Sequence, residues 1–174
     1  LSNKLVTDNP VNRCYYCKQG VFGTILEAAK NDGMTVILDG TNASDNADDR
    51  PGMKALQEMK VLSPLRMCGY VKSEIRKQSK EAGLFVYNKP SYACLATRIP
   101  TGTEIDEEKI KQVETAETFL FDLGFSDFRV RWMDNKAKIQ MPESQLQALM
   151  EKREIVLEEL SKIFNEVLLD LRTR

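Results

Sequence analysis

The chain has 174 residues and a formal net charge of −1, with 25 basic and 26 acidic side chains. A protein whose main task is to hold nucleic acid carries a clear excess of Lys and Arg, so this balance argues against such a partner. There is no histidine, which excludes Ser-His-Asp and Cys-His catalysis and every zinc site that uses histidine. The apolar content of 42% is ordinary for a soluble globular protein, and no apolar run is long enough to cross a membrane.

The N-terminal residues are polar and lack the apolar core of a secretory signal. We therefore expect the four cysteines to lie in a reducing compartment, the cytoplasm, where metal binding or catalysis is more common than structural disulfides. The sequence does not begin with methionine. This favours a processed chain or a fragment of a longer one.

Helix and strand signals alternate along the first half of the chain. Thr35 to Asp39 is a short apolar run of the kind found in fully buried parallel strands. The spacing of the signals predicts βα units around a parallel sheet, which is an α/β arrangement. In chain order, the expected elements are a helix over 13–30, a strand over 35–39, a polar loop over 40–50, a helix over 51–59, a strand at 61–62 and a helix over 71–82.

The second half, from about Thr103, has the pattern of a small α+β domain. Acidic residues after Asp106 mark a helix start, and Gly124 marks its end. Asp134 and Asn135 suit the turn of a β-hairpin. We expect a helix over 106–123, strands over 125–133 and 137–141, a long helix from 143 to about 165 and a last strand over 167–169. The predicted domains are therefore residues 1–102 and 103–174.

Cys14 and Cys17 form a C-x-x-C pair at a predicted helix start, where thiol pKa values are lowered. The pair fits a redox couple, half of a zinc site or part of an iron–sulfur site. A four-cysteine zinc site that adds Cys68 and Cys94 is also allowed. Alternatively, the two cysteines have no role in chemistry.

Cys94 lies in an irregular segment that breaks all periodicity, with Lys89 and Arg98 nearby in sequence. Such a positive environment stabilises a thiolate. The alternative is a small apolar residue that fills space beneath the loop. We favour that second interpretation for Cys68.

Arg129 and Arg131 alternate with apolar residues on a predicted strand, so both guanidinium groups lie on the same face. Two neighbouring arginines form a clamp for phosphate or carboxylate. From the residues alone, a solvated strand face is the better interpretation.

An acidic loop follows the first predicted strand, at the edge of the sheet where α/β proteins bind ligands. It indicates a site for magnesium or a nucleotide, although an ordinary polar loop with Asx turns has the same composition. No Walker A and no G-x-G-x-x-G motif occurs in the chain. The polar residues of the loop are Asp39, Asn42, Asp45, Asp48, Asp49 and Arg50.

Taken in order, these segments resemble the LarE family, whose members are PP-loop (ATP pyrophosphatase-type) sulfur transferases. The resemblance covers residues 9–170, and its most specific part is Lys-Pro-Ser-x-x-Cys-Leu-Ala-x-Arg-Ile-Pro over 89–100. The other matching segments are 9–18, 38–42, 49–52 and 129–131. It implies a partial adenine-nucleotide-hydrolase-like parallel sheet followed by a small substrate-binding and oligomerisation domain.

The resemblance also implies a reaction. With ATP and Mg²⁺, such an enzyme converts a carboxylate of pyridinium-3,5-biscarboxylic acid mononucleotide into an acyl-adenylate. A sulfur nucleophile then displaces AMP and leaves the thiocarboxylate precursor of the nickel-pincer cofactor of lactate racemase. The implied partners are this nucleotide-like small molecule and further copies of the chain, without nucleic acid or membrane.

Site residues follow from the same resemblance. Cys94 matches the sulfur-bearing cysteine of the family. The presence of Cys14 and Cys17 indicates the variant in which three cysteines hold a 4Fe–4S cluster with one open iron. The residues expected on the nucleotide side are Lys18, Asp39 and Asn42. Those expected to hold the substrate phosphate and carboxylates are Arg98, Arg129 and Arg131, so the clamp becomes the preferred interpretation.

One family motif is missing, because no Ser-Gly-Gly-x-Asp-Ser segment, which cradles the pyrophosphate of ATP, occurs in the chain. We therefore expect a fragment that does not adenylate by itself, with a C-terminus that diverges from the family over 171–174. The alternatives are another PP-loop enzyme, either a tRNA thiolase or an amidotransferase-like synthetase, and a thiolate metal-binding module without turnover.

Overall fold

The computed structural model describes residues 1–45 and 51–172, and it divides the chain into two compact units. Unit 1 comprises Leu1–Asn9 and Pro90–Arg174, and unit 2 comprises Pro10–Lys89. The predicted domain boundary was at residue 102, whereas the structure divides the chain after Asn9 and after Lys89. The expectations for Asp48, Asp49 and Arg50 lie outside the described residues.

The N-terminal segment belongs to unit 1 because it is hydrogen-bonded to the loop that follows Arg98. Asn9 is fully buried with a positive φ of 53°, and its side-chain amide donates to the carbonyls of Pro100 (2.7 Å) and Thr103 (3.0 Å). In return, the Asn9 carbonyl accepts from the Gly102 N–H at 2.9 Å. Buried polar groups need such partners, so Asn9 fixes where the chain leaves unit 1.

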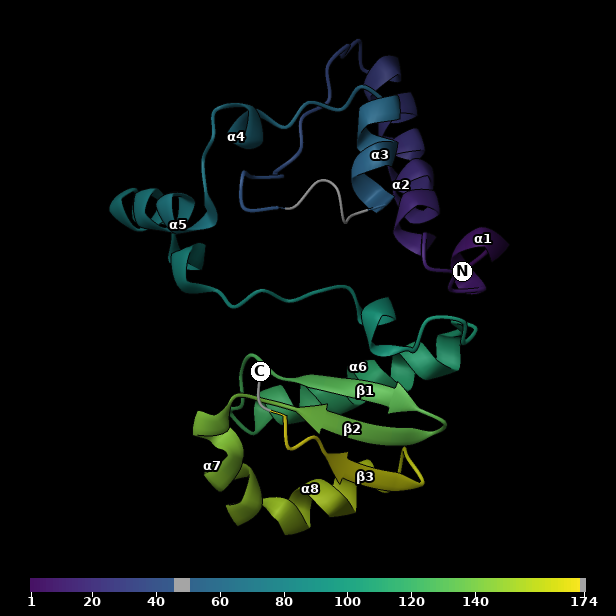
Figure 1. Ribbon diagram of the computed structural model, residues 1–174, viewed down its shortest axis with the longest axis vertical. Coiled ribbons are helices and arrows are strands. Elements are labelled where there is room, and N and C mark those ends of the chain that lie inside the picture. The colour runs from purple at the N-terminus through teal and green to yellow at the C-terminus, as the bar shows by residue number, and fades with distance from the viewer. Residues whose placement is uncertain (46–50, 173–174) are drawn as a thin grey trace. The chain divides into compact units, whose positions relative to one another are not determined.

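Unit 1 is built on helix α6 and a three-stranded sheet (Figure 1). As predicted, α6 (Glu107–Asp122) begins after Asp106, whose side chain accepts a hydrogen bond from the Lys109 N–H at 2.7 Å. Gly124, with φ of 92°, follows its end. The remaining short helices of the unit are α1 (Lys4–Thr7), η2 (Leu95–Arg98), η3 (Glu143–Gln145), α7 (Leu146–Glu151) and α8 (Arg153–Leu160).

The sheet has the strand order β1 (Arg129–Met133), β2 (Lys136–Gln140), β3 (Glu166–Leu169). β1 and β2 are antiparallel, and β2 and β3 are parallel. The two-residue turn between β1 and β2 is the predicted one, because Asp134 and Asn135 both adopt the left-handed conformation that such a hairpin requires. The predicted last strand is also present.

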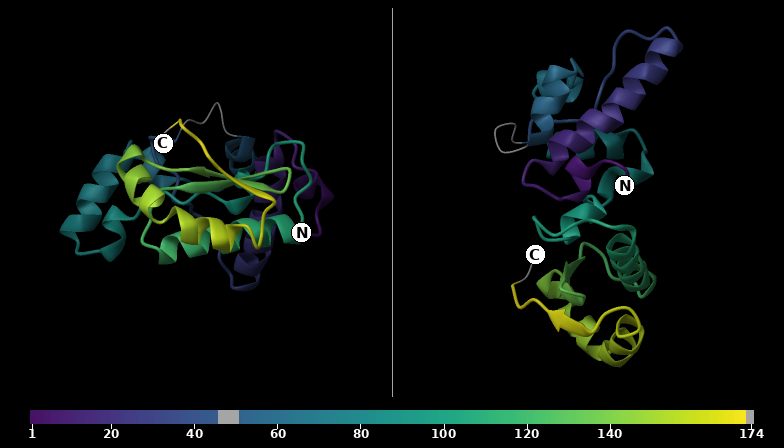
Figure 2. Two further views of the ribbon diagram at one scale, coloured as in Figure 1. Left: turned by 90° about the horizontal axis from the view of Figure 1, so that it is seen from below. Right: turned by 90° about the vertical axis from the view of Figure 1, so that its right-hand side faces the viewer.

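Helices α6 and α8 cover one face of this sheet (Figures 1 and 2). Alternate residues of each strand point to the helices and enclose a continuous apolar core. The other face carries the polar side chains. The core residues are Ala116, Leu120, Phe125, Phe128, Val130, Ala137, Ile139, Met141, Leu149, Val156, Leu160 and Phe164.

The single long helix predicted from 143 to about 165 is wrong. Three shorter helices occupy this stretch, and α7 passes into α8 at Lys152, whose backbone (φ −101°, ψ 11°) is not helical. The Lys152 ammonium donates to the carbonyl of Leu123 at 2.8 Å and lies over the Phe125 ring. A 3.6-residue apolar period continues through such a break, so the pattern gave no sign of it.

Unit 2 contains the predicted helices and only a trace of the predicted sheet. One isolated parallel bridge joins Leu38 to Leu62, with hydrogen bonds from Asp39 N–H to Leu62 carbonyl and from Leu62 N–H to Ile37 carbonyl. Helices α2 and α3 lie side by side (Figure 1). The helices of the unit are α2 (Arg13–Asn31), α3 (Pro51–Glu58), α4 (Pro64–Met67), α5 (Lys72–Glu81) and η1 (Phe85–Asn88).

The expectation of a fully buried strand over 35–39 is wrong. Val36 and Leu38 are 57% and 59% exposed. A strand is buried on both faces only when other elements cover both faces, and within unit 2 the described residues supply a single bridge partner. Among residues 1–45 and 51–172, no helix has the length and apolar character needed to span a membrane.

Candidate functional site

The segment that carries Cys94 is held in unit 1 by short-range hydrogen bonds. Cys94 is exposed and directly precedes η2 (Leu95–Arg98). Its carbonyl accepts from the backbone N–H of Thr97 at 2.9 Å and from the Thr97 hydroxyl at 2.7 Å. The thiol therefore lies at the surface on a backbone that is locally fixed.

A buried ion pair attaches this segment to helix α6. Arg98 Nε and Nη2 donate to the two carboxylate oxygens of Glu117 at 2.7 and 3.0 Å, and both side chains are essentially inaccessible to water. Arg98 Nη1 donates to the Ala93 carbonyl and the Thr97 hydroxyl. In this structure Arg98, expected to bind substrate, has its donors directed at protein groups and positions the Cys94 segment.

Glu117 is the centre of the arrangement, and the sequence interpretation missed it. Besides Arg98, its carboxylate accepts from the Val130 N–H at 2.8 Å and from the Tyr92 hydroxyl at 2.5 Å. The position of Glu117 in the sequence could have indicated this role. A carboxylate at helical spacing among Val113, Ala116 and Leu120, on the buried side of α6, needs a buried partner.

Tyr92 lies beside two guanidinium groups, with the Arg98 and Arg129 Cζ atoms 5.1 and 5.6 Å from its ring centroid. Burial, the hydrogen bond to Glu117 and the charge of Glu117 raise the pKa of Tyr92 to about 12. Arg129 is also buried, and it donates to the carbonyls of Phe128 and Ser91, each at 2.6 Å. Arg129 thereby fixes the start of the Cys94 segment.

Arg131 differs from the other two arginines because it is half-buried and lines a pocket. It donates from Nε to Gln140 Oε1 at 2.8 Å and from Nη1 to the Thr97 carbonyl at 2.5 Å. The pocket has a volume of about 360 Å³ and lies between the 97–101 segment and strands β1 and β2. An anionic ligand therefore has one of the predicted arginines within reach.

Cys14 and Cys17 lie in the first turns of α2, and both are exposed. Arg13 Nη2 is 3.9 Å from the Cys14 sulfur, which places a positive charge beside the thiol. Further along the same helix, Lys18 packs against α3: a Cβ atom added at Gly52 would come within 3.0 Å of the Lys18 side chain. The lack of a side chain at Gly52 thus lets α3 approach α2 closely.

Asp39 accepts hydrogen bonds from the hydroxyls of Ser63 and Thr41, each at 2.6 Å. Burial alone would raise the pKa of Asp39, but these hydrogen bonds and the nearby charge of Lys18 outweigh burial and lower the pKa below its usual value. Asn42 accepts from the Ser44 N–H at 3.0 Å, an Asx turn of the kind that an ordinary polar loop contains.

Each unit thus gathers part of the predicted site. Unit 1 brings Cys94, Arg98, Arg129 and Arg131 into one region, whereas unit 2 holds the C-x-x-C pair and the acidic loop. Within either unit, residues 1–45 and 51–172 contain no group of three Cys, Asp or Glu side chains that could hold a metal ion. The predicted cluster draws its three cysteines from both units, so it stays a prediction. Cys68, at the end of α4, is exposed and thus does not fill space in a core.

No protein-family model matches the chain. It is similar to an uncharacterized protein of Synechocystis, with 38% identity over 164 residues, which are 94% of this chain and 60% of the relative. It is 33% identical over 172 residues to the pyridinium-3,5-bisthiocarboxylic acid mononucleotide synthase of Lactiplantibacillus plantarum, covering 98% of this chain and 62% of that protein. An uncharacterized protein of Methanocaldococcus jannaschii is 31% identical, with 97% and 66% covered. The chain thus spans about two thirds of the length of these relatives or less.

Proposed function

We propose that the chain is part of a LarE-type, PP-loop sulfur transferase that inserts sulfur into pyridinium-3,5-biscarboxylic acid mononucleotide. Two findings support this. The named relative from L. plantarum is similar along nearly the whole chain. The observation that carries the proposal is the exposed Cys94, fixed by the buried Arg98–Glu117 pair next to a pocket lined by Arg131.

The proposed reaction needs an activated carboxylate, because an ionised carboxylate is a poor electrophile. In adenylation with ATP and Mg²⁺, a carboxylate oxygen bonds to the α-phosphorus and pyrophosphate leaves, so that this oxygen becomes part of a leaving group. A sulfur nucleophile then bonds to the acyl carbon, the carbon–oxygen bond to AMP breaks, and AMP leaves with the electron pair. Cys94 holds the sulfur at the surface, where such a substrate can approach.

We propose that Cys14, Cys17 and Cys94 together ligate a 4Fe–4S cluster. All three thiols are exposed, and three thiolates would leave one iron of such a cluster without a protein ligand. When bound, the cluster would supply exchangeable sulfide at that iron. The guanidinium of Arg13, whose Nη2 lies 3.9 Å from the Cys14 sulfur, places a positive charge beside this proposed ligand.

Lys18, Asp39 and Asn42 are proposed to lie on the nucleotide side of the site. The lowered pKa keeps Asp39 ionised at neutral pH, which suits Mg²⁺, and the nearby Lys18 charge suits a phosphate. Asn42 shapes the loop through its Asx turn. For the substrate acid groups we propose Arg131 as the contacting residue, with Arg98 and Arg129 holding the segment in place.

Metal analysis of the chain tests this proposal. After anaerobic reconstitution with iron and sulfide, we expect about four irons and four acid-labile sulfides per chain. Cys94→Ser should reduce this content strongly, and so should Cys14→Ser. Cys68→Ser is the matched control, because Cys68 is also exposed but lies outside the proposed ligand set.

Sulfur transfer is the second measurement, made on the complete protein that carries this chain. Cys94→Ser should abolish formation of the thiocarboxylate, and Cys68→Ser should leave it nearly unchanged. Full activity of the Cys94→Ser protein would refute the central assignment. A single tightly bound zinc instead of iron and sulfide would favour the metal-binding module without turnover.

A further inference from the structure

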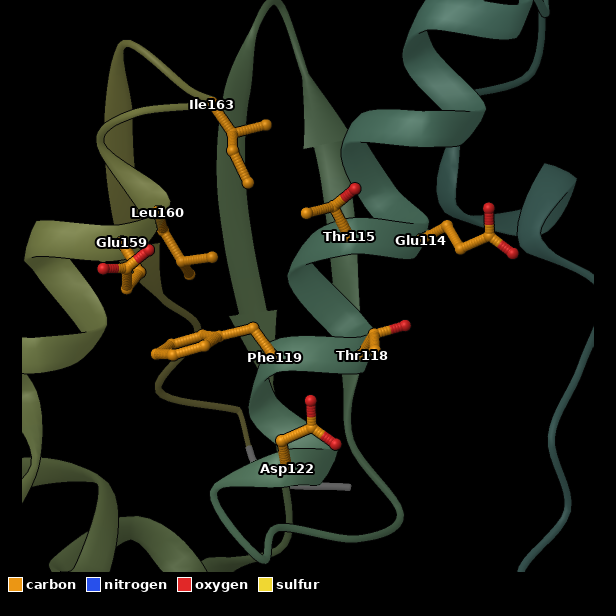
Figure 3. A pocket seen from close by; sticks show the side chains of 8 residues that line it. All are labelled: Glu114, Thr115, Thr118, Phe119, Asp122, Glu159, Leu160 and Ile163. Carbon is orange, nitrogen blue, oxygen red and sulfur yellow. The ribbon is translucent and has the colours of Figure 1, made fainter.

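Two pockets of unit 1 carry opposite charge. The first lies between α6 and α8, where Phe119 extends toward Leu160 (Figure 3). Its charged lining residues are all acidic, namely Glu114, Asp122 and Glu159. The second is the pocket beside η2, whose charged lining residues are all basic, namely Arg98, Arg131 and Lys138. In the second pocket Arg98 is paired with Glu117 and inaccessible to water, so Arg131 and Lys138 are the lining cations that an anion can reach.

Lys138 occupies a position comparable to that of Arg131 in this second pocket. The two residues are directly opposite each other on β2 and β1, and both lie on the polar face of the sheet. Lys138 Nζ lies 3.1 Å from Asp170 Oδ2, and its side chain is 29% exposed. An ammonium has three donors, so this ion pair does not saturate it.

A chain of hydrogen bonds fixes both cations across the three strands. Gln140 accepts from Arg131 Nε at 2.8 Å and donates to Asp170 Oδ2, also at 2.8 Å. Asp170 therefore orients Lys138 directly and Arg131 through Gln140.

Asp170 is itself firmly placed. Its backbone N–H donates to the Ile139 carbonyl at 2.9 Å, and its Oδ1 accepts from the Arg172 N–H at 3.1 Å. Hydrogen bonds from Gln140, the Arg172 N–H and Lys138 lower the pKa of Asp170 to about 2. The carboxylate is therefore charged at any working pH.

We propose that Lys138 is a second substrate-contacting cation beside Arg131, and that Asp170 and Gln140 are positioning residues for this pair. The ligand class is a mononucleotide with a carboxylate-bearing pyridinium ring, and this part rests on the proposed function. That the pocket binds an acid group does not rest on the proposed function, because the charge and geometry of the pocket alone support it.

The test is a binding titration of the 174-residue chain. Isothermal titration calorimetry measures the Kd directly and is preferred to tryptophan fluorescence, because the indole of Trp132 packs against α6 on the other face of the sheet, where its Nε1 donates to Gln112 at 2.9 Å. The probes are nicotinic acid mononucleotide, nicotinamide mononucleotide and inorganic phosphate. Lys138→Met should raise the Kd of nicotinic acid mononucleotide roughly tenfold and reduce its salt dependence, and Lys138→Arg should restore most of the affinity. A loss with both mononucleotides assigns Lys138 to the phosphate, and a loss with the acid alone assigns it to the ring carboxylate.

Lys136→Met is the matched control. Lys136 lies on the same face of β2 and pairs with Glu166 of β3 at 2.7 Å, but it does not line the pocket, so its substitution should leave the Kd unchanged. Asp170→Asn separates positioning from simple electrostatics. Loss of a negative charge alone would tighten anion binding, whereas loss of orientation should weaken it roughly threefold.

Three results would overturn the inference. They are equal affinity of Lys138→Met and the unsubstituted chain, tighter binding by Asp170→Asn, and no saturable binding of any probe. None of them bears on the iron, sulfide and thiocarboxylate measurements that test Cys94. The two proposals can therefore fail separately.

Discussion

Unit 1 and unit 2 bury their apolar residues to very different extents. The sheet and helices of unit 1 enclose a core with many fully buried side chains, including Leu120, Phe128 and Val130. In unit 2 the buried apolar residues among those described are Ala55, Leu56 and Val61. Unit 1 therefore holds its part of the site by its own packing, whereas unit 2 leaves much of its apolar surface exposed.

The polar interactions of the two units differ in the same way. Around Cys94, Arg98 and Arg129 are buried and paired with backbone carbonyls or with Glu117. Around Asp39 the hydrogen bonds join half-buried groups, such as the Asp39 carboxylate and the Ser63 hydroxyl. Buried charge pairs are costly to break from one side, so substitutions in unit 1 should have the larger effects.

The largest effect is expected from Glu117→Gln, because it leaves the buried guanidinium of Arg98 without its counter-charge. Such a loss costs about 3–5 kcal/mol of unfolding free energy. Urea unfolding followed by Trp132 fluorescence measures unit 1, which contains the only tryptophan. Glu114→Gln, on the exposed side of the same helix, should change the midpoint little. Equal effects of the two substitutions would contradict the role given to the ion pair.

A smaller effect is expected from a matched pair of leucine truncations. Leu120→Ala in the core of unit 1 should cost about 2–5 kcal/mol, since it leaves a cavity. Leu38→Ala in unit 2, where the side chain is 59% exposed, should stay within about 0.5 kcal/mol. Far-UV circular dichroism during urea unfolding measures both variants. A cost at Leu38 as large as that at Leu120 would show that the residue is covered in solution.

The smallest effect concerns pH and Tyr92. Because the folded pKa is raised from 10.0 to about 12, the folded state retains a proton that the unfolded state releases. The contribution of Tyr92 is complete below pH 10 and is lost as the pH rises toward 12. The difference in thermal midpoint between the unsubstituted chain and Tyr92→Phe should therefore narrow over this window. A constant difference would mean that the hydroxyl does not donate to Glu117.

Local signals predicted the elements well wherever the chemistry is local. The capping side chain of Asp106 and the left-handed residues Asp134 and Asn135 depend on their immediate neighbours, and the structure confirms the helix and the hairpin that they predicted. The apolar pattern of 35–39 was wrong about burial. Burial depends on which other elements cover a strand, and a strand's own residues do not contain that information.

The candidate site shows the same division. Sequence spacing placed Arg129 and Arg131 on one strand face, as the structure has them, and the motif drew attention to Cys94. The sequence could not show that Arg129 is buried and Arg131 half-buried. That distinction depends on Glu117, 19 residues beyond Arg98, and on the packing of α6 against the sheet. Whether Cys14, Cys17 and Cys94 share a cluster stays a prediction.

The hydrogen bonds that join Asn9 to Pro100, Gly102 and Thr103 have a consequence for the chain topology. Unit 1 is interrupted in sequence between Asn9 and Pro90, so unit 2 is inserted into the sequence of unit 1. Replacing residues 10–89 by a flexible linker of about ten residues would shorten the closed loop about eightfold, which lowers the entropic cost of closure by about 1.8 kcal/mol. Unit 1 alone would then contain Cys94 without Cys14 and Cys17, so that the thiol chemistry of Cys94 can be measured separately.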